Sequence, residues 1–183
     1  LEPIDADPGA AERGNFIHQA LDDFLRAFPD HIPEDALEQM LAIGEAAFGE
    51  ALGRPGVRAF WWPRFERIAE WFINQERDFR AGLTQIHSEV SGRITFDAPA
   101  GPFTLTAKAD RVDELTGGGL AIADYKTGAV PAAKDIRGGV SSQLSLEAVI
   151  AQAGGFDGVP AQPAAMLTYW KLSGGDPPGE LSP

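Results

Sequence analysis

An acid and an amine stand two residues apart in the stretch ADYKTG, residues 123–128, directly after the apolar run GLAIA. Residues two apart in a β-strand lie on the same face, so Asp124 and Lys126 are expected to point the same way. The preceding loop is centred near Gly117, and pairing that is symmetric about this loop sets Asp110 opposite Asp124. Directly opposed side chains have Cβ atoms about 4.5–5.5 Å apart. The hairpin therefore predicts two carboxylates and a lysine in one place.

These residue types suit the hydrolysis of a phosphodiester bond. A hard divalent cation such as Mg²⁺ takes carboxylate oxygens and shares its coordination with a phosphate. Such a cation polarises the phosphoryl oxygen and acidifies a bound water. A lysine beside it can orient or deprotonate that water, or stabilise the charge that develops on the phosphate. The alternative is a ladder of surface salt bridges on a solvated face, because exposed Asp–Lys pairs are common and weak.

The elements that would position these residues follow from the spacing of apolar side chains. Residues 13–28 repeat apolar residues every four positions, which predicts an amphipathic helix that Pro29 ends. A second helix is expected within residues 31–52, and a third, kinked or broken at Pro63, runs to about Arg80. After Gly82, alternation of apolar and polar residues predicts strands at 84–96, 103–112, 120–127 and 164–173, with a helix at 142–153.

This order of elements predicts an α/β (α+β) fold, in which a helical part precedes a central mixed, largely antiparallel sheet flanked by helices. We expect residues 1–12 to form a linker and residues 174–183 a flexible tail. Between them, residues 13–173 are expected to form a single domain, with a helical part over 13–81 and a sheet core over 82–173. Both ends resemble linkers, so we expect a domain taken from a longer protein.

The composition and net charge of the chain limit the kinds of function it can have. The 183 residues carry a formal net charge of −12, which argues against a nucleic-acid binder because phosphate neutralisation needs Lys and Arg. That objection weakens if the acids bind metal, if bases cluster locally, or if another part of a larger protein holds the nucleic acid. The sequence has no cysteine, so disulfides, zinc–thiolate sites and iron–sulfur clusters are not expected within this segment.

Four motifs resemble those of a known family. IADYKTG resembles the Asp-x-Lys motif of the PD-(D/E)XK nuclease superfamily in its RecB-like form, and AKADRVDEL resembles the strand that precedes that motif. RGNFIHQALDDF resembles the first motif, a Gly followed four residues later by a His. SSQLSLEAVIA resembles the later Gln-x-x-x-Tyr motif, with Glu147 where Tyr is usual. The chain is most similar to the C-terminal nuclease domain of AddB, a subunit of the bacterial AddAB helicase–nuclease, which implies a restriction-endonuclease-like αβββαβ core.

The resemblance implies roles for the matching residues. His18, Asp110 and Asp124 match the metal ligands, and Tyr125 would lend its backbone carbonyl to the metal. Asp110, Asp124 and Lys126 match the catalytic residues, with Lys126 as the catalytic lysine. Without the resemblance, His18 would be interpreted as a buried or capping histidine beside the apolar stripe of its helix.

Further residues match less specific family positions. Glu89 matches an acid near the metal, and Gln143 matches a glutamine that touches DNA or orients the site. Lys134 and Arg137 are candidates for phosphate contacts, although exposed solubilising charge explains them equally well. The two residues expected to be structural, pairing at the strand end, are Arg111 and Asp113.

The resemblance implies a Mg²⁺-dependent DNA exonuclease, in which Mn²⁺ can substitute, acting in double-strand break repair. Its expected partners are DNA and an AddA-like subunit of a helicase–nuclease complex, in the cytoplasm of a bacterium. The alternative is a nuclease-fold module that has lost activity and holds DNA or a partner subunit. No apolar run approaches the ~20 residues of a membrane-spanning helix, so no membrane association is expected.

Overall fold

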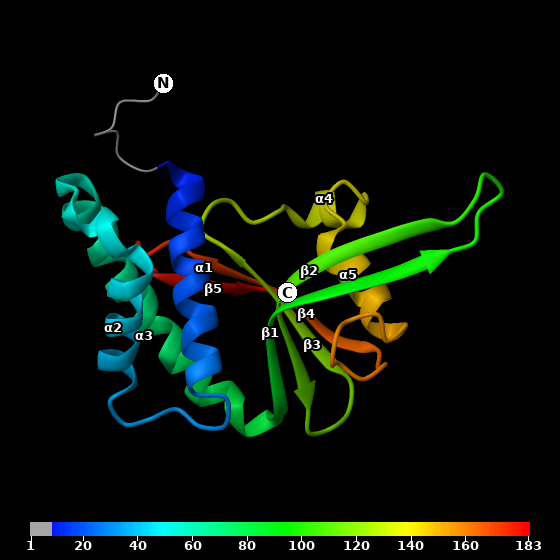
Figure 1. Ribbon diagram of the computed structural model, residues 1–183, viewed down its shortest axis with the longest axis horizontal. Coiled ribbons are helices and arrows are strands. Elements are labelled where there is room, and N and C mark those ends of the chain that lie inside the picture. The colour runs from blue at the N-terminus through cyan, green and yellow to red at the C-terminus, as the bar shows by residue number, and fades with distance from the viewer. Residues whose placement is uncertain (1–8) are drawn as a thin grey trace. The chain divides into compact units, whose positions relative to one another are not determined.

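The computed structural model describes residues 9–183, apart from the side chains of Ala133 and Arg137. Figure 1 shows its helices and strands. The chain forms two compact units. The first contains the chain up to Ala81 with two later segments, Tyr125–Ala129 and Trp170–Leu181, and the second contains Gly82–Asp124, Val130–Tyr169 and Ser182–Pro183. None of the helices within residues 9–183 is both long enough and apolar enough to span a bilayer.

The first unit is built on three helices, α1 (Ala10–Ala27), α2 (Ala36–Phe48) and α3 (Trp62–Phe79). The apolar stripe predicted for the first helix is buried on α1, which begins three residues before the predicted start. The Phe24 carbonyl accepts the last helical bond from the Phe28 N–H, and Pro29 cannot continue the helix. The stripe packs against other aromatic residues, with the Phe24 and Phe72 ring centroids 6.4 Å apart.

The connection from α2 to α3 differs from the predicted break at Pro63. A 3₁₀ turn (Gly49–Gly53) is followed by a π-helical turn (Val57–Trp61) that runs directly into α3. Pro63 lies in the first turn of α3 directly after this π-helical turn, and the helical run continues past the proline. Another 3₁₀ turn (Arg80–Gly82) follows α3.

α2 and α3 approach most closely at Gly44. A Cβ at this position would lie 2.1 Å from Cε1 of Phe65, so only glycine fits without a shift of that ring. Phe65 in turn packs against Phe48, with ring centroids 5.4 Å apart. The helical unit is therefore held by aromatic side chains that interdigitate between its helices.

The sheet has five strands in the order β1-β2-β3-β4-β5 and is mixed but mostly antiparallel, as predicted. Its strands are β1 (Leu83–Phe96), β2 (Phe103–Leu115), β3 (Leu120–Lys126), β4 (Ala164–Leu172) and β5 (Gly179–Ser182). The predicted register of the hairpin between β2 and β3 is confirmed, because Arg111 pairs with Ala123 and Val112 pairs with Ile122. The paired stretch ends with Arg111 and Ala123, one residue before Asp110 and Asp124.

β1 and β2 form a long hairpin that extends past the end of α5 (Gln143–Gln152) in Figure 1. Near α5, one face of this hairpin joins the core of the second unit, and farther out the hairpin is exposed. The buried side chains of this core come from the four strands β1 to β4, from α5 and from the loop after it. They include Val90, Ala109, Val112, Ile122, Leu144, Ile150 and Phe156.

Two elements lie where no regular structure was predicted. α4 (Ala133–Arg137) is a single short helix in the loop after β3. β5 lies within residues 174–183, for which the sequence indicated a tail. Its four residues have weak strand preference of their own, and they take extended form because β4 lies beside them in the sheet.

Candidate functional site

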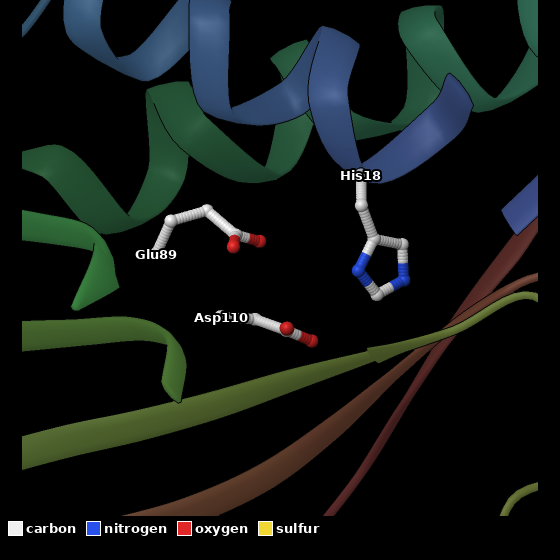
Figure 2. A group of neighbouring side chains, drawn as sticks. All are labelled: His18, Glu89 and Asp110. Carbon is white, nitrogen blue, oxygen red and sulfur yellow. The ribbon is translucent and has the colours of Figure 1, made fainter. Parts of the chain in front are cut away.

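Two acids face each other across the β1–β2 hairpin. Ser88 pairs with Arg111 and Val90 with Ala109, so Glu89 lies opposite Asp110. Figure 2 shows these two side chains. Each offers a carboxylate oxygen as a ligand atom, and these two atoms lie within 4.8 Å of each other.

The backbone of Glu89 is in an unusual conformation. Its φ is +51°, in the left-handed region, which no other non-glycine residue occupies among residues 9–183. Side chains with a Cβ are disfavoured there because the Cβ approaches the following carbonyl oxygen. The Glu89 carboxylate forms an ion pair with the exposed Lys108 ammonium group, which lies two residues from Asp110 on β2. A strained residue in a cluster of ionisable side chains is typical of a functional site.

A third acid, Asp124, is held from α5. Asp124 is buried near the end of β3, and its Oδ1 accepts a hydrogen bond from the side-chain amide of Gln143 in the first turn of α5. The same amide nitrogen donates to Oε1 of Glu147, one helical turn later, at 3.2 Å. Glu147 is buried as well. Gln143 therefore links two buried carboxylates and fixes one oxygen of Asp124.

Within the first unit, α1 lies against the segment that directly follows Asp124. A Cβ at Gly14 would lie 3.2 Å from the Thr127 hydroxyl oxygen, so the glycine permits a close approach. His18 is one turn further along the same face of α1. Its ring meets that of Tyr125 edge-on, with centroids 5.8 Å apart and an interplanar angle of 89°.

Tyr125 is fixed by aromatic packing. Its ring centroid lies 6.2 Å from that of Phe72 and 5.9 Å from that of Trp170. Edge-to-face contacts of this kind are favourable for aromatic pairs. The backbone around Tyr125 is therefore held firmly at the end of β3, between Asp124 and Lys126.

The other predicted residues differ in how exposed their side chains are. Lys126 is half-buried as the last residue of β3, and Lys134 is exposed on α4. The side chain of Arg137 lies outside the described part of the chain. Arg111 and Asp113 form the ion pair that was expected, but this pair is buried, with Arg111 Nε donating to both carboxylate oxygens of Asp113 at 2.8 Å.

Two neighbours of the candidate ligands had no site role in the sequence interpretation. Lys108 forms an ion pair with Glu89. Glu147 was noted only as a departure from the usual tyrosine. Its spacing of four from Gln143 on a helix was the available signal, because residues four apart on a helix are neighbours.

Comparison with known proteins identifies a family. The sequence profile of the PD-(D/E)XK nuclease superfamily matches residues 1–180. An uncharacterized protein of Rickettsia bellii is 24% identical over 151 residues, which cover 82% of this chain and 18% of that protein. An uncharacterized protein of Rickettsia typhi is 24% identical over 155 residues with the same coverage, 82% and 18%. The chain thus spans less than a fifth of the length of these relatives.

Proposed function

Because the chain belongs to the PD-(D/E)XK nuclease superfamily, we propose that it is a metal-dependent deoxyribonuclease domain that hydrolyses phosphodiester bonds of DNA. The observation that carries this proposal is the facing pair of Glu89 and Asp110, whose carboxylate oxygens lie within 4.8 Å of each other. A family fold alone does not specify chemistry, so the proposal depends on these side chains.

The donor set fits a hard divalent cation. Mg²⁺ binds oxygen ligands at about 2.0–2.1 Å, so two ligands of one ion lie at most about 4.2 Å apart. The bound of 4.8 Å for the Glu89 and Asp110 oxygens is within a small side-chain adjustment of that limit. Mg²⁺, or Mn²⁺ in its place, would be held by Asp110, Asp124 and His18, with the Tyr125 carbonyl and with Glu89 beside them. When bound, the ion acts as a Lewis acid and lowers the pKa of a water that it coordinates.

The other residues have separate proposed roles. Lys126 follows Asp124 on the same face of β3, where its ammonium group would orient the attacking water or stabilise charge on the phosphate. Gln143 holds Asp124, and its exposed position at the start of α5 is where DNA would contact it. Lys134 and Arg137 of α4 would contact phosphate groups of the DNA.

We further propose that the domain works as an exonuclease in a helicase–nuclease complex that processes double-strand breaks in the bacterial cytoplasm. Two observations support this setting. The matched relatives are much longer, with only 18% of their length covered. The net charge of −12 also favours an arrangement in which an AddA-like partner or other parts of a longer protein hold most of the DNA.

The proposal is tested by cleavage of end-labelled linear DNA at low salt with Mg²⁺. Asp124→Ala removes a proposed metal ligand, and Lys126→Ala removes a charge-stabilising group, a change that typically costs about 10²–10³ in kcat. Glu114→Gln is the matched control, because Glu114 is a half-buried acid of β2 that pairs with His87 away from these residues.

Loss of cleavage in both alanine variants, with the Glu114→Gln control unaffected, is the expected result. Cleavage that persists unchanged in Asp124→Ala and Lys126→Ala contradicts the proposal. DNA binding by the wild-type chain without any Mg²⁺-dependent cleavage would favour the inactive module that holds DNA or a partner subunit.

A further inference from the structure

The side-chain amide of Gln143 links two buried acids. Its nitrogen donates to Oδ1 of Asp124 and to Oε1 of Glu147. Both acids are 2% exposed, so neither carboxylate can exchange these bonds freely for bonds to bulk water. Gln143 itself is an exposed residue, and its side chain reaches inward from the first turn of α5.

The orientation of this amide has chemical consequences. A glutamine amide has a donor end, NH₂, and an acceptor end, the carbonyl oxygen. If the amide turned by half a rotation, its oxygen would face the Asp124 carboxylate, and two acceptors would repel each other. Asp124 alone accepts one hydrogen bond from the amide. Asp124 and Glu147 together accept hydrogen bonds from both of its N–H groups.

We propose that Glu147 is a positioning residue for the metal site. Glu147 holds the Gln143 amide with its donor end toward Asp124, and that amide holds Asp124 Oδ1 so that the second carboxylate oxygen is directed to the ion. Glu147 lies on the same face of α5 as Gln143, four residues later, which is the spacing that allows this contact. The inference rests on the proposed function, because it takes Asp124 as a metal ligand.

The first test measures Mn²⁺ affinity of the 183-residue chain by isothermal titration calorimetry. Glu147→Leu removes the acceptor, and we expect a loss of about 10–100-fold in affinity, the usual effect of losing a group that orients a metal ligand. Glu147→Gln removes the charge but keeps an oxygen acceptor, so it should bind Mn²⁺ nearly as the wild type does. Glu114→Leu and Glu114→Gln are the matched controls from the same unit, and neither should change the affinity.

Comparing the variants distinguishes a positioning role of Glu147 from an effect of its charge. Equal weakening by Glu147→Leu and Glu147→Gln would mean that Glu147 acts through its charge, and unchanged affinity in Glu147→Leu would mean that it does not act; either result overturns the inference. A double-mutant cycle adds a second criterion. If Glu147 acts through Gln143, then Glu147→Leu should have little further effect in a Gln143→Ala background.

A measurement made without metal tests this inference independently of the proposed function. Nuclear magnetic resonance can follow the exchange of the Gln143 NH₂ protons with water. In the wild type both protons should exchange slowly, and Glu147→Leu should speed exchange of at least one. Fast exchange of both protons in the wild type overturns the inference, whereas a wild-type chain that shows this protection but binds no Mn²⁺ refutes the metal-dependent function alone.

Discussion

The left-handed backbone conformation of Glu89 allows a prediction of how two substitutions there change the free energy of unfolding. Its φ of +51° places the Cβ close to the following carbonyl oxygen, which costs about 1–2 kcal/mol for a residue with a side chain. Glycine avoids this cost but loses about 0.5–1 kcal/mol through the greater freedom of the unfolded chain. Glu89→Gly should therefore be more stable than Glu89→Ala by roughly 0.5–1 kcal/mol.

Comparing these two variants isolates the backbone. Both lose the carboxylate and its ion pair with Lys108, which contributes little because Lys108 is 60% exposed. Only Glu89→Gly also relieves the strain. The free energy of unfolding is measured by urea denaturation followed by circular dichroism, and the expected difference corresponds to about 1–4 °C in Tm for a chain of this size.

The same two variants test the role of the side chain. If Glu89 lies beside the metal, both should bind Mn²⁺ more weakly than the wild type, even though Glu89→Gly relieves backbone strain. The reasoning is refuted if Glu89→Ala equals or exceeds Glu89→Gly in stability, because the strain would then be absent. If both variants bind Mn²⁺ as tightly as the wild type does, the strained backbone of Glu89 has no connection with metal binding.

Further predictions concern packing, a buried ion pair, the metal and salt. Gly44→Ala should lower the free energy of unfolding by about 1–3 kcal/mol in urea denaturation, because its Cβ would meet the ring of Phe65. Asp113→Ala should cost about 3–5 kcal/mol in the same assay, since it leaves the charge of Arg111 buried without this partner. Ca²⁺ should bind in calorimetry without supporting efficient cleavage in the DNA assay. DNA affinity measured by fluorescence anisotropy should fall steeply between about 50 and 200 mM salt.

The hairpin geometry could be predicted from the sequence because it depends on local signals. The glycine-rich loop centred near Gly117 sets the register of β2 and β3, and alternation of apolar residues sets the faces of the strands. The register that pairs Arg111 with Ala123 follows from these two signals. The long amphipathic helix that carries His18 was likewise visible in its spacing of apolar residues.

Other features depend on tertiary contacts that no local pattern reports. The positive φ of Glu89 arises inside a regular strand, at a residue type that gives no hint of it. β5 takes extended form beside β4, although its own sequence indicates a tail. Likewise, a kink or break was expected at Pro63 because a proline in a helix interior removes a hydrogen bond, but a π-helical turn precedes it and the helical run continues into α3.

The network around Gln143 is an intermediate case. The family resemblance implied two roles for Gln143, touching DNA or orienting the site. Its hydrogen bond to Asp124 is a contact through which it can orient the site. The inward direction of Glu147 could not be read from the sequence, because α5 has apolar residues around much of its circumference and therefore no clear buried face.

The location of Mn²⁺ in crystals of the 183-residue chain, found by anomalous diffraction, tests the metal site most directly. The account predicts a single strong peak within about 2.0–2.3 Å of carboxylate oxygens of Asp110 and Asp124, with His18 and Glu89 beside it. Peaks found only at other acidic side chains, or no peak at Mn²⁺ concentrations that support DNA cleavage, would contradict the assignment of this site.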